Sequence, residues 1–295
     1  GLFVLGCFMS GMAQPVFSLA RQSWLTDAVP VAYRARALST LGGVMRIGMF
    51  IGPFIAAAAI HRFGLAGAWA VGMAALLAAG WVAARLPELP AATGAAGAAA
   101  VALPTLRSSG RDHRHVFVTL GVGVLLVSAV RATRQAVIPL WADHLALEAS
   151  VAALIFGLAN GIDMLVFYPA GKLMDQKGRL WVVLPCTLIM GLALLLMPLS
   201  QDATGLLLAA ALLGFGNGIG SGMVMTLGAD HSPRIGRAHF LGVWRLMADI
   251  GGSCGPALLS LLAATLSLGA GIAATGLIAF AAAAQLAWWI PRLRR

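Results

Sequence analysis

Asp27-Ala28-Val29-Pro30 recurs 203 positions later as Asp230-His231-Ser232-Pro233. The same shift relates further positions, which are Arg34 with Arg237, Gly11 with Gly214, and Gly48-x-x-x-Gly52-Pro53 with Gly251-x-x-x-Gly255-Pro256. A repeat of this length without a gap indicates that the chain holds two related halves. Because no inversion is needed to superimpose the two copies, we expect both halves to have the same orientation.

The composition places this chain among membrane proteins. Of its 295 residues, 60% are hydrophobic and only 10% are charged, and the mean hydropathy is +0.90. A soluble domain carries about 25% charged residues. The three cysteines, Cys7, Cys186 and Cys254, lie in apolar runs without metal-site spacing, so we expect small buried side chains and no metal. The fold expected is an all-α, polytopic bundle of membrane helices.

Nine apolar segments are long enough to cross a bilayer. They are 2–25, 36–60, 65–84, 116–142, 150–171, 180–199, 205–228, 237–262 and 268–290. The interval 85–115 is rich in Pro, Ala, Gly and Arg and is predicted to be a linker. The predicted domains are therefore a three-helix bundle at 1–84, the linker at 85–115 and a six-helix bundle at 116–295.

The basic residues fall almost entirely on one side of this predicted topology. That side holds Arg34, Arg36, Arg85, Arg107, Arg111, Arg114, Lys172, Lys177, Arg179, Arg234, Arg237, Arg292, Arg294 and Arg295. The opposite loops hold only Arg62. The positive-inside rule then predicts a cytoplasmic linker and C-terminus in a multi-pass protein of the cytoplasmic (inner) membrane. The net charge of +10 is thus explained by the anionic inner leaflet of the lipid bilayer, and we expect no nucleic-acid partner.

The segment Gly171-Lys172-Leu173-Met174-Asp175-Gln176-Lys177-Gly178-Arg179 resembles the cytoplasmic G-x-x-x-D-x-x-G-R signature of the major facilitator superfamily (MFS). Gly48-x-x-x-Gly52-Pro53 resembles the fifth-helix motif of the antiporters in that family. The resemblance covers the whole chain and implies an MFS transporter fold. That fold has twelve helices, of which these nine would be the fourth to the twelfth, so we expect a chain truncated at its N-terminus. Cys7 stands where the fourth helix of the family often carries an arginine that is linked to proton coupling.

The function implied by the resemblance is secondary active transport of a small molecule by alternating access. Proton-coupled efflux is the leading expectation, with protons as a second partner and a monomer as the working unit. One alternative is uptake by a symporter or uniporter of the same fold, and another is a non-transporting membrane protein or a nonfunctional fragment. No catalytic triad, phosphate-binding loop or paired catalytic carboxylates occur in the sequence, so we expect neither an enzyme nor a cofactor.

Two groups of residues are expected to control the movement of the bundles. A conformational latch is predicted to pair Arg179 with Asp230, and it comprises Gly171, Asp175, Gly178, Arg179, Asp230 and Asp27. The alternative is an ordinary solvated loop. Close helix packing is predicted at glycines four residues apart, together with the prolines that follow them: Gly48, Gly52, Pro53, Gly251, Gly255 and Pro256.

Charged residues within the apolar segments are the strongest functional candidates, because each is costly in lipid. We expect Arg46 to pair with Asp163 across the two bundles, either structurally or as the coupling element. Asp249 lies 203 positions after Arg46 and one helical turn after Arg245, which is its expected partner.

A second set of polar residues is expected to face a substrate cavity. Arg131 and Arg134 are three residues apart, so they share a helix face and are predicted to bind an anionic or polar substrate. For these arginines the alternative is snorkelling towards the membrane surface. The further cavity candidates are Gln135, Asn160, Asn217 and Gln14. Asn217 lies among the glycines of 214–218, where ordinary helix packing is the competing explanation.

Overall fold

The structure is a computed structural model that describes residues 2–28, 34–85, 110–220, 222–233 and 237–293. Within these ranges some side chains, including those of Arg46 and Asp175, lie outside the description. The described residues are mostly helical and contain no strand, which confirms the expected all-α class.

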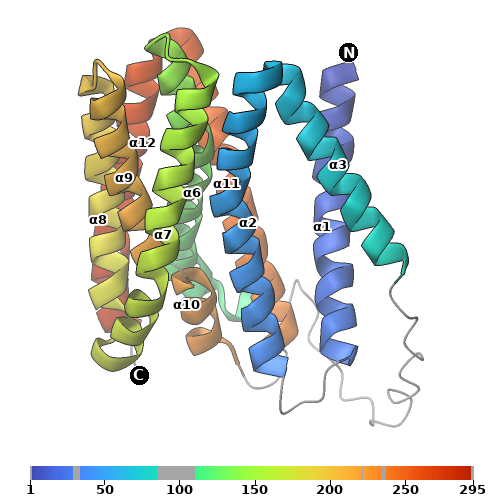
Figure 1. Cartoon of the computed structure of the whole chain (residues 1–295). Helices are drawn as coiled ribbons and strands as arrows, with labels where there is room; N and C mark the ends of the chain where they lie inside the picture. The colour runs from blue at the N-terminus through green and yellow to red at the C-terminus, as the bar shows by residue number, and fades with distance from the viewer. Residues whose placement is uncertain (1, 29–33, 86–109, 221, 234–236, 294–295) are drawn as a thin grey trace. The chain divides into compact units, whose positions relative to one another are not determined.

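Figure 1 labels the helices in chain order. Those in the first part of the chain are α1 (Leu2–Ala28), α2 (Arg34–Phe63) and α3 (Leu65–Ala84). The next are α5 (Arg114–Val116), the π-helix η2 (Phe117–Gly121), α6 (Val122–His144), α7 (Ala149–Lys177), α8 (Leu180–Leu196) and the 3-10 turn η3 (Met197–Leu199). The last are α9 (Ala203–Ile219), α10 (Met223–His231), α11 (Arg237–Thr265) and α12 (Leu268–Leu293).

Among the described residues, seven helices are long and apolar enough to cross a membrane. They are Leu65–Ala84, Arg114–His144, Ala149–Met174, Leu180–Leu199, Ala203–His231, His239–Thr265 and Leu268–Leu293. The remaining two predicted segments are represented by the shorter apolar stretches Val4–Gln14 and Ile47–Phe63. The membrane-spanning character that the composition predicted is therefore confirmed.

The chain divides into two compact units, which are described separately. One comprises 1–49 and 72–99, and the other comprises 50–71 and 100–295. In the first unit Arg21 lies over the ring of Phe17 and donates to the sulfur of Met45. The second unit contains the hydrophobic core and every polar contact discussed below.

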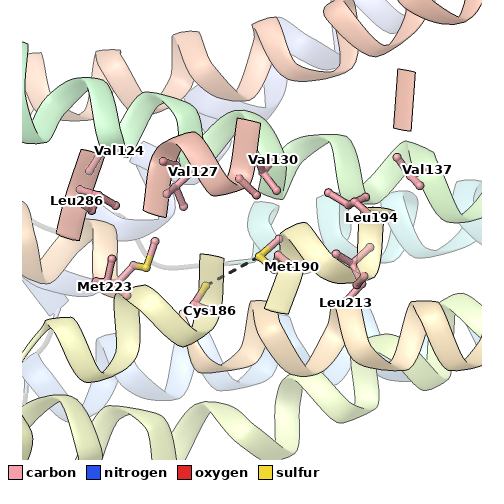
Figure 2. Close-up of a cluster of buried hydrophobic side chains, with 14 of the residues drawn as sticks. Val124, Val127, Val130, Val137, Cys186, Met190, Leu194, Leu213, Met223 and Leu286 are labelled. Carbon is pink, nitrogen blue, oxygen red and sulfur yellow. Dashed lines mark hydrogen bonds between the residues drawn. The ribbon is translucent and has the colours of Figure 1, made fainter. Parts of the chain in front are cut away.

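The core of the second unit is mostly aliphatic and draws side chains from every helix from α6 to α12. Val124, Val127 and Val130 recur at helical spacing on α6, and all are at most 2% exposed. Figure 2 shows these valines facing Leu286 of α12 and Met190 of α8. One stripe of each helix is fully apolar, so these helices pack against each other along that stripe. This packing fixes the position of the polar residues of α6 along the helix axis.

Local signals explain where several helices begin and end. Asp202 caps α9, because its carboxylate accepts a hydrogen bond of 2.7 Å from the backbone N–H of Gly205. Gly178 has φ 97° and ends α7, a conformation that glycine adopts without strain. Gly64, with φ 66°, turns the chain between α2 and α3 in the same way.

The structure differs from the sequence-based expectation in three places. The segment 205–228 was expected as one helix, but it is broken between Ile219 and Met223. A π-helix precedes α6, which the apolar pattern did not indicate. Cys186 is buried as expected, whereas Cys7 and Cys254 are exposed. The burial expected for these two was wrong because a helix face that fronts lipid is as apolar as a core face.

Candidate functional site

Two glycines on α9 bring this helix into backbone contact with α7. A β-carbon at Gly214 would collide with the carbonyl oxygen of Ala159, and one at Gly218 would lie 2.7 Å from the carbonyl oxygen of Asp163. Only glycine permits this approach. The close contact places Asn217 of α9 beside Asp163 of α7.

Asp163 forms an ion pair with Arg134 of α6. Nη1 of Arg134 lies 3.1 Å from Oδ2 of Asp163, and the two side chains are 2% and 16% exposed. Arg134 also donates from Nη2 to the side-chain oxygen of Asn160, one turn before Asp163 on α7. A charge at this depth is tolerated only when it is paired and hydrogen-bonded, and Arg134 meets both conditions.

Asn217 connects this ion pair to a second arginine. Its side-chain nitrogen donates to Oδ2 of Asp163 at 2.7 Å, and its side-chain oxygen accepts from Nε of Arg131 at 2.8 Å. Arg131 also donates from Nη1 to the backbone carbonyl of Gly220 at 3.1 Å. The result is one continuous polar network across α6, α7 and α9, inside the apolar part of the second unit.

The network carries two guanidinium groups and one carboxylate. Arg131 is bonded to an amide and a carbonyl, which are neutral, so the carboxylate of Asp163 balances the charge of Arg134. Such a cluster can exchange hydrogen-bond partners and attract negative charge. We call these five residues, Arg131, Arg134, Asn160, Asp163 and Asn217, the polar network.

Four of the six predicted cavity residues therefore meet in the polar network, together with Asp163. Of the other two, Gln135 is exposed on α6, one turn after Arg131, and Gln14 is exposed on α1 in the first unit. The expected partner of Asp163, Arg46, has a side chain outside the described residues, so that pairing stays a prediction. Arg245 and Asp249 form the expected pair at 2.9 Å, on an exposed face of α11.

The predicted latch pair also lies within contact distance. Arg179 donates from Nε to Asp230 at 2.7 Å and from Nη2 at 3.0 Å, and it contacts the carbonyl of Met174 from Nη1 at 3.2 Å. This joins the end of α7 to the end of α10. The surroundings of Gly171 and the side chains of Asp175 and Asp27 lie outside the description.

The packing glycines behave differently in the two copies of the repeat. On α11, a β-carbon at Gly251 or Gly255 would collide with the carbonyl oxygen of Leu125 or Ala129 on α6. On α2, no described atom lies within 4 Å of the corresponding position at Gly48 or Gly52. The remaining two motif residues are the prolines, Pro53 and Pro256, and both lie inside helices. Pro53 and Phe54 face Gly157 of α7.

The sequence did not predict one element of the site, the helix break between α9 and α10, where Gly220 and Gly222 lie. Gly222 has φ 82°, and Gly220 contacts Cys186 so closely that a β-carbon would collide with its sulfur. The signal was available, because Gly220-Ser221-Gly222 is a poor helix former. A separate apolar pocket of about 300 Å³ lies beside Leu199 and Leu208, away from the polar network.

The chain was compared with protein-family models and with curated proteins. The model of the Major Facilitator Superfamily matches residues 1–238 and, in a second match, residues 120–295. No curated protein matches the sequence. The two overlapping matches together cover the whole chain. The chain therefore belongs to the major facilitator superfamily and is a multi-pass membrane protein that transports a small molecule.

Proposed function

We propose that this protein is a proton-coupled exporter in which Asp163 is the group that binds the proton. The observation that carries the proposal is the position of Asp163, which is mostly buried, paired with Arg134 and hydrogen-bonded by Asn217. Ionisable residues inside a membrane bundle typically belong to ion or proton pathways. The resemblance of Gly48-x-x-x-Gly52-Pro53 to the antiporter motif supports the direction.

The ion pair provides a physical reason for coupling. A proton on Asp163 removes the negative charge that compensates Arg134, which is only 1% exposed as a whole residue. An uncompensated charge at such a site costs several kcal/mol, so the protonated form favours a different arrangement of the helices. In an exporter, substrate and proton would occupy the network alternately. Arg131 and the exposed Gln135 are the proposed substrate-facing residues on α6.

Two further parts of the proposal concern orientation and movement. The clustering of basic residues supports an inner-membrane location with the C-terminus in the cytoplasm. The bidentate contact between Arg179 and Asp230 supports a latch that holds one conformation and opens when the bundle rearranges. The side chains of these two residues are 26% and 36% exposed. When the latch opens, water can therefore solvate both charges, and the free-energy cost is small.

The test uses membrane vesicles that contain the protein and a pH-sensitive dye. A panel of small amphipathic compounds is added after a proton gradient has been imposed. We expect at least one compound to dissipate the gradient and to be transported uphill, and Asp163→Asn to abolish both. Asp143→Asn is the matched control, since Asp143 is an exposed aspartate outside the network. Unchanged uphill transport by Asp163→Asn would refute the proton role.

Uptake by proton symport is a second candidate, and one specific observation favours it. The network holds two guanidinium groups for one carboxylate, so an anionic substrate and a proton on Asp163 can bind together without changing its net charge. The same vesicles distinguish the two functions. An antiported compound moves against the direction of proton flow, whereas a symported compound moves with it.

A further inference from the structure

The break between α9 and α10 leaves backbone groups without regular helical partners inside a membrane span. Ala203–His231 is otherwise one apolar span of 29 residues. Gly222 takes φ 82°, and the N–H of Gly220 reaches the carbonyl of Gly216 only at 3.4 Å. Freed backbone groups must be satisfied internally at this depth. The carbonyl of Gly220 accepts from Nη1 of Arg131 at 3.1 Å and from the N–H of Met223 at 3.2 Å.

Arg131 therefore bonds to two groups at once, the backbone carbonyl of Gly220 at the break and the side-chain amide of Asn217. Its Nε donates to the side-chain oxygen of Asn217, so the nitrogen of that amide is turned towards Asp163. An amide has one accepting and one donating end, and fixing one end fixes the other. No hydrogen bond is seen between Arg131 and Asp163 in the described part of the chain, so Arg131 acts on the carboxylate through Asn217.

We infer that Arg131 is a positioning residue that couples the protonation of Asp163 to the direction of α10 relative to α9, through the carbonyl of Gly220. This inference rests on the proposed function, because it requires a proton to bind Asp163. A carboxylate accepts from the nitrogen of Asn217, as observed. A protonated carboxyl group can also donate from its O–H, and when it donates to Asn217 it must bond to the amide oxygen.

The reversal of Asn217 has a direct consequence for the break. Once the amide has turned, its nitrogen faces Nε of Arg131, and two donors cannot bond to each other. The guanidinium then leaves both Asn217 and the carbonyl of Gly220. The carbonyl of Gly220 then keeps only the N–H of Met223 of its two donors, and α10 takes a new direction relative to α9.

The charged groups around Asp163 decide how it responds to pH, and its expected partner on α2, Arg46, has a side chain outside the described residues. Among the described residues, α6 contributes Arg134 directly and Arg131 through Asn217. On α9 the facing residue is the uncharged Asn217, and α2 presents Phe50, Pro53 and Phe54 to the neighbouring glycines of α7. Cys186 of α8 lies at Gly220, on the other side of the break.

The test follows the direction of α10 as the pH changes. The full chain carries Cys7→Ser and Cys254→Ser, retains the buried Cys186, and receives a bimane label at Met225→Cys, an exposed position on α10. We expect a single pH transition in the bimane emission, which Asp163→Asn abolishes. A label at Leu208→Cys, exposed on α9 before the break, should show no transition.

Two variants of Arg131 decide the inference. Arg131→Gln removes the charge, and Arg131→Lys keeps it but has no planar fork to hold Asn217 and Gly220 together. We expect both variants to lose the transition, and the lysine variant guards against a failure to fold. Persistence of the full transition in Arg131→Lys or Arg131→Gln, or its absence from the parent protein, would overturn the inference. Gradient-driven transport that still depends on Asp163 would then show that the proposed function survives alone.

Discussion

Gly255 and Ala129 are in backbone contact, since a β-carbon at Gly255 would overlap the carbonyl oxygen of Ala129. This contact and its counterpart at Gly251 and Leu125 fix the distance between α11 and α6. On the same helix, a β-carbon at Gly252 would make only an ordinary contact, with Ala132 Cβ at 3.9 Å. Gly255 and Gly252 therefore offer a matched pair for testing helix packing.

Gly255→Val is expected to destabilise the protein and Gly252→Val to have little effect. Overpacking a tight contact costs about 1–3 kcal/mol, and here the colliding atom is backbone that cannot rotate away. The thermal unfolding midpoint in detergent should fall for Gly255→Val only. Equal midpoints for the two variants would contradict the close contact between α6 and α11.

Arg134→Leu is expected to be more damaging than the double variant Arg134→Leu/Asp163→Leu. The single change removes the guanidinium that pairs with the mostly buried carboxylate of Asp163, and breaking a buried pair from one side costs about 3–5 kcal/mol. Replacing both residues removes the carboxylate together with the guanidinium, so much of the stability should return. Thermal unfolding of the three proteins in the same detergent measures this coupling, and additive losses would show that the two residues do not depend on each other.

Exchanging the charges of Arg179 and Asp230 tests the latch. Each single reversal, Arg179→Asp or Asp230→Arg, places like charges together and should reduce transport several-fold, while the double exchange should recover most of it. Thermal stability should change by less than about 1 kcal/mol, because the pair is partly exposed. Recovery of transport without a matching change in unfolding would separate a latch from a structural contact. Failure of the double exchange to recover any transport counts against the latch.

Gly222→Ala tests the helix break directly. Gly222 has φ 82° and no neighbour within 4 Å, so the cost comes from backbone conformation alone and should be about 1–2 kcal/mol. Gly72→Ala is the control, since Gly72 also has open space but lies within the regular helix α3, where alanine is favoured. The unfolding midpoint should fall for Gly222→Ala and remain or rise for Gly72→Ala. A lower midpoint for Gly72→Ala alone would reject this explanation.

The sequence predicted the helices well because apolar length decides where a membrane helix can form. The predicted segments 65–84 and 268–290 agree closely with α3 and α12. It also predicted most members of the polar network, because charge and amide groups at mid-membrane depth are rare. Depth follows directly from residue count along a helix, at about 1.5 Å per residue.

The partners within the network were harder to predict from the sequence. The expected pairing of Asp163 with Arg46 comes from their depth and from the facing fifth and eighth helices of the family, and it stays a prediction, whereas Arg134 on α6 is a described partner that the sequence did not indicate. Depth does not say which way a side chain points around its helix axis, nor how neighbouring helices are rotated. The sequence also does not show that Gly214 and Gly218 allow α9 to approach α7 closely enough for Asn217 to reach Asp163.

The π-helix at Phe117–Gly121 has a consequence for everything that follows it on α6. The side chain of Gln285 on α12 donates to the carbonyl of Thr119 within this turn at 3.1 Å. A π-turn accommodates one extra residue, and one residue corresponds to about 100° of helical rotation. If the turn tightened to regular α-helix, both arginines would swing around the axis by that angle and leave their present partners. The π-helix that precedes α6 therefore sets the direction in which the arginines point, several turns further along the helix.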